Sequence, residues 1–439
     1  MKLTKHSQLL MSFFLKKKCI EPSNLTKKTE KILTSLYYDI LEANKYIDST
    51  KKKMGSKFYK LQTNEIHSIT QIPKPTMFPN DSFPKEVREH INDNTNNHLT
   101  YNFSLFDRLI KFHFVIEDSN LEIQIEKYNK YVDIMLTWMY ILNQYASKSC
   151  SKEITVYLYF TELLKKLPDT NIQILGSNHV NTAFTTTCPK VSEIVIFRKE
   201  EWFKVFMHET FHNFALDFSN MNNDECTKNI LNIFPVKSDV NLYEAYAEFW
   251  AEIMNVCFCS FMEMSRNDDI HKNQQNIDNF IVHCEIFINF ERTYSFFQMV
   301  KALGFMGLSY KDLYSMTPQS IILRENLYKE DSNILSYYVI KLVLLNNYQG
   351  FLSWCDTNNT SLLQFKQTTQ NQKDFCTFIE KNYKNKPFLE SVKCTERIIN
   401  SVKVVKGQEK VKGQNKILLK NDQIDFILKN MRMSICELG

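Results

Sequence analysis

Long apolar stretches are missing from this 439-residue chain. No uninterrupted run of apolar residues approaches the ~20 that a helix needs to cross a bilayer. The run at residues 9–15 is short, is followed by three lysines and has no small-residue cleavage site, so it does not fit a secretory signal. The sequence therefore predicts a protein without a membrane span.

Closely spaced cysteines are missing as well. The 11 cysteines are widely scattered, odd in number and contain no C-x-x-C pair. Without a secretory signal, their simplest interpretation is reduced thiols in an intracellular compartment, the cytoplasm. Structural disulfides are the alternative interpretation.

A strong excess of one charge is also absent. Lys+Arg 54 against Asp+Glu 49 gives a net charge of +5, which is too small for nucleic-acid binding across the whole surface. The lysine-rich segments 1–60 and 401–421 contain no interleaved aromatic residues in a recognisable motif. The second of them repeats Val-Lys-Gly-Gln and is typical of a solvated linker. We therefore expect no nucleic-acid partner, and the oligomeric state stays open.

What the chain does contain is ample material for a core. Hydrophobic residues make up 44% and aromatic residues 13% of it, which is typical of a folded globular protein. The pattern along the chain predicts four regions. These are a Lys-rich N-terminal region with a Pro-containing linker (1–100), a core-building domain (101–260), a helical C-terminal subdomain that completes the cleft (261–400), and a basic linker with a terminal helix (401–439).

The secondary-structure pattern predicts an α+β fold. Its features are a small sheet ahead of residue 200 and a mostly helical C-terminal half. The expected strands are 103–116, 121–125, 154–160, 180–186 and 193–197. The expected helices are 128–145, 242–262, 276–304, 333–348 and 373–384. The sheet would brace a helix that follows it directly from residue 202 onward.

That helix carries the most informative motif, H-E-x-x-H at residues 208–212. Residues four apart share one helix face, so His208 and His212 can bind one metal ion. Glu209 then lies beside a zinc-activated water and can accept its proton. The alternative is a surface helix that happens to carry two histidines.

A catalytic zinc usually takes three protein ligands plus water. Glu244, Glu248 and Glu252 are spaced by four on an otherwise apolar segment, so they form one acidic stripe on a helix. Buried carboxylates are costly unless they are paired or bind a metal. Either Glu244 or Glu248 fits as the third ligand, and a stripe that faces solvent is the alternative.

The motif and the later E-x-x-A-E segment resemble the gluzincins, the H-E-x-x-H metallopeptidases that include thermolysin and anthrax lethal factor. The resemblance covers roughly residues 153–256 and implies a zincin-like core with a mixed sheet and Zn²⁺ as cofactor. Because Phe249-Trp250-Ala251 continue as in thermolysin-like sequences, it favours Glu244 as ligand and places Glu248 behind a histidine. Asn181 and Ala183 resemble the Asn-Ala-Phe edge strand that pairs with a peptide substrate in that family.

The resemblance implies zinc-dependent hydrolysis of peptide bonds in a protein or peptide substrate, with Glu209 as general base. The chain also resembles uncharacterised predicted metallopeptidases of large DNA viruses, which share its Lys/Asn-rich bias, and this resemblance implies a virion-associated protein. The alternative function is a catalytically inactive structural or interaction protein that retains zinc for stability.

Two supporting roles stay open in the sequence. Gluzincins often stabilise the oxyanion with a His or Tyr, and the downstream candidates are His283, Tyr310, Tyr337 and Tyr338. Asp217, five residues after His212, either orients a ligand histidine or caps the helix.

Overall fold

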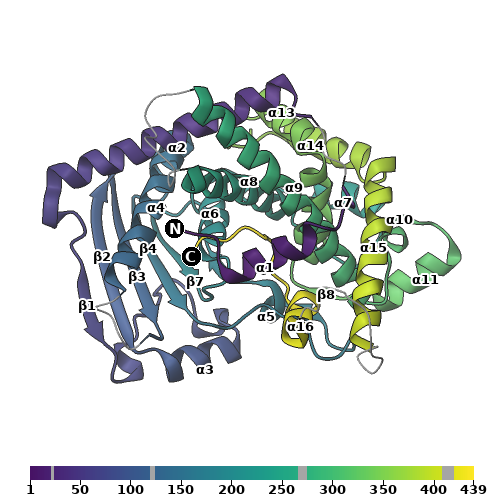
Figure 1. Cartoon of the computed structure of the whole chain (residues 1–439), viewed down its shortest axis with the longest axis horizontal. Helices are drawn as coiled ribbons and strands as arrows, with labels where there is room; N and C mark the ends of the chain where they lie inside the picture. The colour runs from purple at the N-terminus through teal and green to yellow at the C-terminus, as the bar shows by residue number, and fades with distance from the viewer. Residues whose placement is uncertain (21–23, 119–123, 265–273, 408–419) are drawn as a thin grey trace.

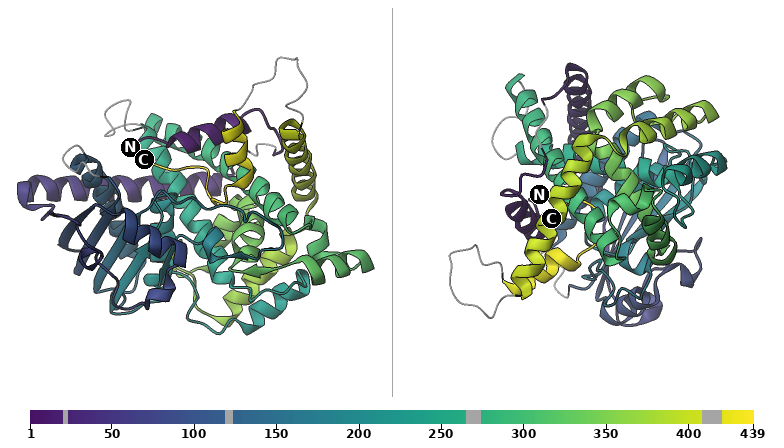
Figure 2. Two further views of the ribbon diagram at one scale, coloured as in Figure 1. Left: turned by 90° about the horizontal axis from the view of Figure 1, so that it is seen from below. Right: turned by 90° about the vertical axis from the view of Figure 1, so that its right-hand side faces the viewer.

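A six-stranded mixed sheet forms one side of the molecule, and helices form most of the rest (Figures 1 and 2). The computed structural model describes residues 1–20, 24–118, 124–264, 274–407 and 420–439. The predicted α+β class is confirmed, since the strands lie in the first half of the chain and long helices dominate the second.

The sheet has the strand order β1-β2-β3-β4-β7-β6. Strands β1 to β3 run antiparallel, β3, β4 and β7 run parallel, and β6 returns antiparallel to β7 at the edge. Their bounds are β1 (Gln62–Glu65), β2 (Asn97–Leu105), β3 (Arg108–Ile116), β4 (Glu153–Phe160), β6 (Ala183–Thr185) and β7 (Val191–Ile196). A second, two-stranded sheet pairs β5 (Leu175–Gly176) with β8 (Glu330–Asp331).

Both faces of the sheet are covered, which explains the nearly continuous apolar run of β4. Val156 and Leu158 belong to the main core, whereas Tyr157 and Tyr159 point to a smaller cluster on the opposite face. This alternation follows from the two-residue period of a strand. The smaller cluster is closed by residues from 66 to 91, which include part of α3 (Lys85–Asn94).

The helices surround α6 (Trp202–Asn213), which packs against β6 and β7 on one side and α8 (Leu242–Met264) on the other. Every residue of α6 is buried. The remaining helices are α1 (Lys5–Phe14), α2 (Lys27–Met54), α4 (Ile125–Tyr145), α5 (Ser177–Val180), α7 (Asp224–Ile233), α9 (Gln274–Phe305), α10 (Tyr310–Tyr314), α11 (Pro318–Leu327), the π-helix η4 (Leu335–Ile340), α12 (Lys341–Asn346), α13 (Tyr348–Asn358), α14 (Thr369–Asn382), α15 (Lys386–Gly407) and α16 (Asn421–Lys429).

The extended segment 430–439 lies inside the molecule beside the first turn of α6. Residues 430–438 are all buried, and Leu3 forms a β-bridge with Leu438, so the two ends of the chain meet (Figures 1 and 2). Glu201, just before α6, accepts hydrogen bonds from the backbone N–H groups of Met433 and Ser434. The C-terminal segment is therefore part of the core that supports α6.

Three expectations for single elements need revision. The strand expected at 103–116 is the end of β2 followed by β3, because Phe106 and Asp107 reverse the chain with left-handed φ of 58° and 57°. The predicted strand 180–186 is mostly not a strand, because α5 occupies its start and β6 covers only Ala183–Thr185. The predicted strand 121–125 falls largely outside the described residues, and Ile125 begins α4.

The expectation that all cysteines are reduced is wrong for four of them. Cys19 pairs with Cys394, and Cys150 pairs with Cys188. The first pair is 375 positions apart in sequence, and the second joins the loop before β4 to the loop between β6 and β7. Disulfides persist in oxidising compartments, so the thiol pattern no longer supports an intracellular assignment.

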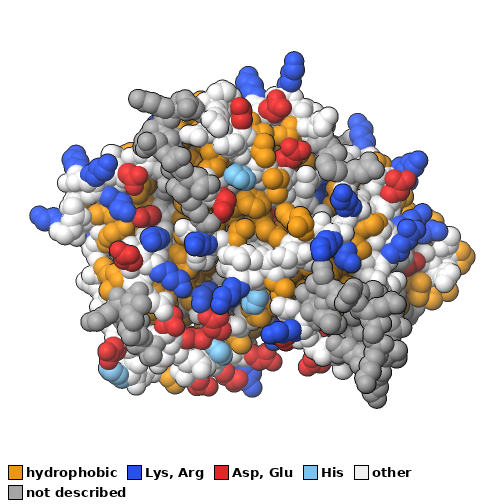
Figure 3. All heavy atoms as spheres, viewed as in Figure 1, with side chains coloured by type: hydrophobic (Ala, Val, Ile, Leu, Met, Phe, Trp, Pro, Cys, Tyr) orange, Lys and Arg blue, Asp and Glu red, His pale blue; other side chains and the backbone are white. Residues whose placement is uncertain are grey.

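Two surface properties bear on partners. Among the described helices, none has both the length and the apolar character that a membrane span requires. On the face shown in Figure 3, Lys and Arg side chains are spread out, with Asp and Glu side chains among them.

Candidate metal centre

His208, His212 and Glu244 direct three ligand atoms toward one point between α6 and α8. The two imidazole Nε2 atoms lie 3.1 Å apart. The Glu244 Oε2 atom is 3.1 Å from Nε2 of His208 and 3.4 Å from Nε2 of His212. The cluster is buried and could hold a metal ion. Of the two carboxylates that the sequence left open, Glu244 therefore joins the histidines.

The spacing of these atoms matches a tetrahedral metal site. Zn–N and Zn–O bonds of about 2.0–2.1 Å in tetrahedral geometry separate neighbouring ligand atoms by about 3.3 Å. The three observed separations of 3.1, 3.1 and 3.4 Å bracket this value. A donor set of two imidazoles and one carboxylate also leaves one position of a tetrahedron for water or substrate.

The opposite side of each imidazole faces a carboxylate. His212 Nδ1 makes a short hydrogen bond to Asp217 Oδ2, and Asp217 is completely buried. His208 Nδ1 lies 3.0 Å from Glu248 Oε2, at ion-pair distance but without the alignment of a hydrogen bond. A carboxylate beside Nδ1 keeps the proton there and leaves Nε2 free for a metal. Asp217 thus orients the histidine, which settles its role over helix capping.

The acidic stripe of α8 points inward, so the solvent-facing alternative is wrong. Glu244 meets the two histidines, and Glu248 pairs with Lys204 at 2.5 Å as well as facing His208. Glu252 pairs with Lys341 at 2.7 Å. Each carboxylate therefore has a cationic or imidazole partner, as buried acidic groups require.

The charges in the cluster favour a bound cation. Burial alone would lower the pKa of His208, but Glu244 and Glu248 outweigh it and raise the pKa to about 9. Burial would raise the pKa of Glu244, yet His212 and His208 hold it well below its usual range. Without a metal, positive charge is thus held on the imidazoles, at the place where a metal ion would supply it.

Glu209 and Tyr337 lie beside the cluster, next to a small cavity. Both line this cavity of ≈ 30 Å³, together with His208 and Ala183. Burial raises the pKa of the Glu209 carboxyl, although His208 and His212 oppose this shift. The Tyr337 hydroxyl donates a 2.8 Å hydrogen bond to Glu244 Oε2, and burial raises the pKa of this phenol, so it stays protonated as a donor.

The expected substrate edge lies beside the same cavity. Thr182 C=O accepts a hydrogen bond from the Phe197 N–H, so Thr182 points toward β7. Because backbone groups alternate along a strand, the N–H and C=O of Ala183 point away from β7, toward the free edge of the sheet. Asn181 also lines the cavity, and its Oδ1 accepts a hydrogen bond from Ser332 at 2.9 Å.

The other oxyanion candidates from the sequence lie elsewhere. The Tyr310 hydroxyl donates to the Tyr383 carbonyl, and the Tyr338 hydroxyl donates to the Met431 carbonyl. His283 is on α9 and stacks on Phe287. Only Tyr337 of the four contacts the His208–His212–Glu244 cluster.

Sequence reasoning missed Lys204, which neutralises Glu248 from within α6. It lies four residues before His208, so it shares the face of the two histidines. The matching period of four in both helices was the signal that could have revealed this pair. The function has to be inferred from the geometry of this site, because no family model, curated protein or solved structure matches the chain.

Proposed function

We propose that this protein is a zinc-dependent peptidase of the gluzincin type. The observation that carries the proposal is the convergence of His208 Nε2, His212 Nε2 and Glu244 Oε2 at tetrahedral spacing. Two imidazoles and one carboxylate suit zinc, and three protein ligands are typical of catalytic zinc sites.

The chemistry follows from the groups around the cavity. A zinc ion held by these ligands supplies Lewis acidity, which polarises a carbonyl and lowers the pKa of water toward ~7. Glu209 accepts a proton from a water molecule in the cavity and later delivers it to the leaving amine. Burial raises its pKa, the direction that suits a group which takes up a proton and later releases it.

Tyr337 is the donor best placed to stabilise the oxyanion. Its hydroxyl lines the cavity and now donates to Glu244, 2.8 Å away. A rotation of the phenol toward the cavity would let it donate to the oxygen that becomes negative during attack. The π-helix that carries Tyr337 is a type of element found frequently at functional sites.

The free edge of β6 suits an extended peptide as substrate. A peptide that pairs with the outward N–H and C=O of Ala183 would extend the sheet by one strand through main-chain hydrogen bonds. Because Ala183 and Glu209 line the same cavity, such a peptide would carry its backbone past the general base. Main-chain pairing of this kind is independent of side-chain sequence.

The cavity itself limits which side chain can enter it. Its ≈ 30 Å³ gives room for about two water molecules, since one needs roughly 10–15 Å³ on this measure. Met433, Val180 and Val205 are the larger apolar residues that line the cavity, and both lysines that line it are paired with Glu201 and Glu248. The cavity is therefore small, and neither lysine is free to pair with an acidic side chain, which favours Gly, Ala or Ser over large or acidic residues.

Substitution of Met433 by Ala is expected to broaden the substrate range. The shorter side chain enlarges the cavity, so peptides with Val or Leu next to the cleaved bond should become substrates. Cleavage of a peptide library, analysed by mass spectrometry, compares the two proteins. Equal cleavage by the wild type of peptides with Leu and with Ala at this position would contradict the size limit.

Zinc affinity should separate the three carboxylates of the acidic stripe on α8, Glu244, Glu248 and Glu252. We expect one zinc ion per chain after purification without chelator. Glu248→Gln should weaken zinc binding about 10- to 100-fold, as for residues that support a ligand, and Glu244→Gln should weaken it further. Glu252→Gln is the matched control, because its pairing with Lys341 lies outside the cluster. Competition with a chromophoric chelator measures the affinities, and a chain that takes up no zinc would refute the proposal.

A further inference from the structure

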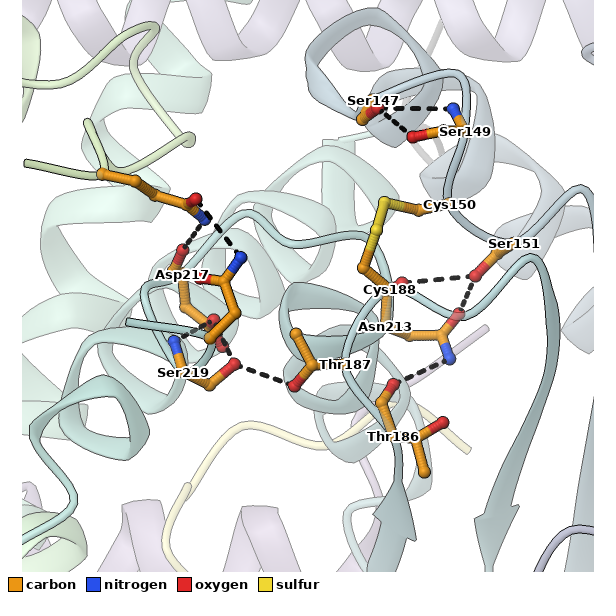
Figure 4. The surroundings of a disulfide bond; sticks show 12 residues. Ser147, Ser149, Cys150, Ser151, Thr186, Thr187, Cys188, Asn213, Asp217 and Ser219 are labelled. Atoms are coloured by element: carbon orange, nitrogen blue, oxygen red, sulfur yellow. Dashed lines mark hydrogen bonds between the residues drawn. A yellow bond between two sulfur atoms is a disulfide. The ribbon is translucent and has the colours of Figure 1, made fainter. Parts of the chain in front are cut away.

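The Cys150–Cys188 disulfide lies close to Asn213, the last residue of α6 (Figure 4). It joins two loops whose Cα atoms are 4.6 Å apart at the cysteines. The loops are also linked by a 2.7 Å hydrogen bond from the Ser151 N–H to the Pro189 carbonyl. One residue in each loop has an unusual backbone conformation, since Ser151 and Cys188 are left-handed with φ of 49°.

Left-handed conformations of residues other than glycine are unfavourable and persist only where the surroundings enforce them. The covalent link between the loops is such a constraint on Cys188. It thereby fixes the position of the neighbouring Thr187.

Thr187 begins a chain of hydrogen bonds that leads to His212, and Figure 4 shows the part from Thr187 through Ser219 to Asp217. The Thr187 hydroxyl lies 2.9 Å from Ser219 Oγ. The Ser219 hydroxyl donates to Asp217 Oδ1 at 2.7 Å, so the Thr187 hydroxyl must be the donor to Ser219. The other oxygen of Asp217 holds the Nδ1 proton of His212. The donors therefore converge on the Asp217 carboxylate, from Thr187 through Ser219 on one side and from His212 on the other.

A second link joins the same loops to the end of α6. The Ser151 hydroxyl donates to the side-chain Oδ1 of Asn213, and the Asn213 side-chain amide donates to Thr185 Oγ1 at 2.9 Å. Asn213 directly follows His212. The disulfide loops are therefore connected to His212 by two routes, one through Asn213 and one through Ser219 and Asp217.

We propose that the Cys150–Cys188 disulfide is a positioning element for His212, acting through Thr187, Ser219 and Asp217. The disulfide holds Thr187 where it orients Ser219, and Ser219 fixes the Asp217 carboxylate. That carboxylate keeps the proton on Nδ1 and presents Nε2 to the metal. This role rests on the proposed zinc site. Peptide hydrolysis by that site does not itself require a disulfide behind His212.

The test is a double-mutant cycle on zinc affinity, measured by competition with a chromophoric chelator. Removal of the disulfide (Cys150→Ser with Cys188→Ser) and Thr187→Val should each weaken zinc binding about 10-fold. Their combination should also weaken it about 10-fold and not about 100-fold, because both changes break one chain. Thr187→Ser keeps the hydroxyl and should restore wild-type affinity.

The other disulfide supplies a matched control. Loss of the Cys19–Cys394 pair, which links the segment after α1 to α15, should leave zinc affinity within about twofold of wild type. Hydrogen exchange of the zinc-free proteins gives a second readout, in which the Ser219 amide should exchange faster only when Cys150–Cys188 or Thr187 is altered.

The outcomes separate this inference from the proposed function. Unchanged affinity in the Cys150–Cys188 and Thr187→Val variants, or strictly additive losses, would overturn the positioning role and leave the zinc peptidase standing. Zinc binding by none of the proteins would overturn both. Should the disulfide variant fail to fold, the folded Cys19→Ser/Cys394→Ser protein, which retains only Cys150–Cys188, is compared before and after reduction with a phosphine. Reduction should weaken its zinc binding about 10-fold, and unchanged affinity would overturn the positioning role.

Discussion

Glu209→Gln is expected to lower kcat for peptide hydrolysis about 100- to 10,000-fold while zinc binding stays within a few-fold of wild type. The amide has nearly the shape of the carboxylate but cannot take up a proton from water at neutral pH. Glu209 is not among the three converging ligand atoms, so the site for the metal persists. Turnover of a cleavable library peptide and zinc content, measured on the same preparation, give the two readouts.

The control and the contrary outcomes make this test decisive for function. Glu225→Gln removes an exposed carboxylate on α7 and should leave kcat unchanged. An unaltered kcat in Glu209→Gln would contradict its role as general base. Wild-type protein that holds zinc but cleaves no peptide would favour the alternative, a zinc-retaining protein without catalysis.

Glu201→Gln is expected to destabilise the fold by about 3–5 kcal/mol, as is typical when one partner of a buried ion pair is removed. Glu201 forms an ion pair with Lys165, and Lys204 lies 4.0 Å away. The amide would leave the Lys165 ammonium buried without its anion. The amide has only one acceptor oxygen, whereas the Glu201 carboxylate now accepts hydrogen bonds from the N–H groups of Met433 and Ser434.

Urea unfolding checks this prediction against an exposed pair. Glu162→Gln breaks the 2.6 Å pair with Lys199, whose side chains are 66% and 36% exposed, and should cost no more than about 1 kcal/mol. Equal losses in the two variants would contradict the role assigned to the buried pair.

The same carboxylate should shape the acid stability of the protein. Burial would raise the pKa of Glu201, but Lys165, Lys204 and Arg432 lower it from 4.5 to about 2. Burial and Lys204 lower the pKa of Lys165 more than Glu201 raises it, so the surroundings disfavour the charged form of this lysine. The lowered pKa of Glu201 shows that they favour the charged form of the carboxylate. The stabilisation is present above pH 4.5 and is lost as the pH falls toward 2. Glu201→Gln should therefore flatten the loss of stability in this window.

Sequence patterns with a strict period predicted the centre of the site well. The spacing of His208 and His212 and the spacing of Glu244 and Glu248 each place side chains on one helix face, which is a local property. The choice between the two glutamates depended on the register of α8 against α6. That register is a tertiary property, and neither helix encodes it alone.

Features that depend on distant contacts were not predictable. The Cys19–Cys394 disulfide joins positions 375 apart, and no local pattern identifies partners at that range. Tyr337 and Tyr338 are adjacent in sequence, and the packing of η4 alone decides which of them reaches Glu244. The strand expected at 180–186 shrank because residues 177–180 form the short helix α5 instead.

The buried C-terminal segment has a consequence for how the chain acquires its structure. A nascent chain folds from its N-terminus at the pace of synthesis, and contacts between remote residues form late because loop closure is entropically costly. Glu201 and Glu291 accept backbone hydrogen bonds from residues 433–436, so both carboxylates lack these four donors in any chain that has not reached those residues. The helix with both histidines thus attains its final surroundings only after residue 436 has been synthesised.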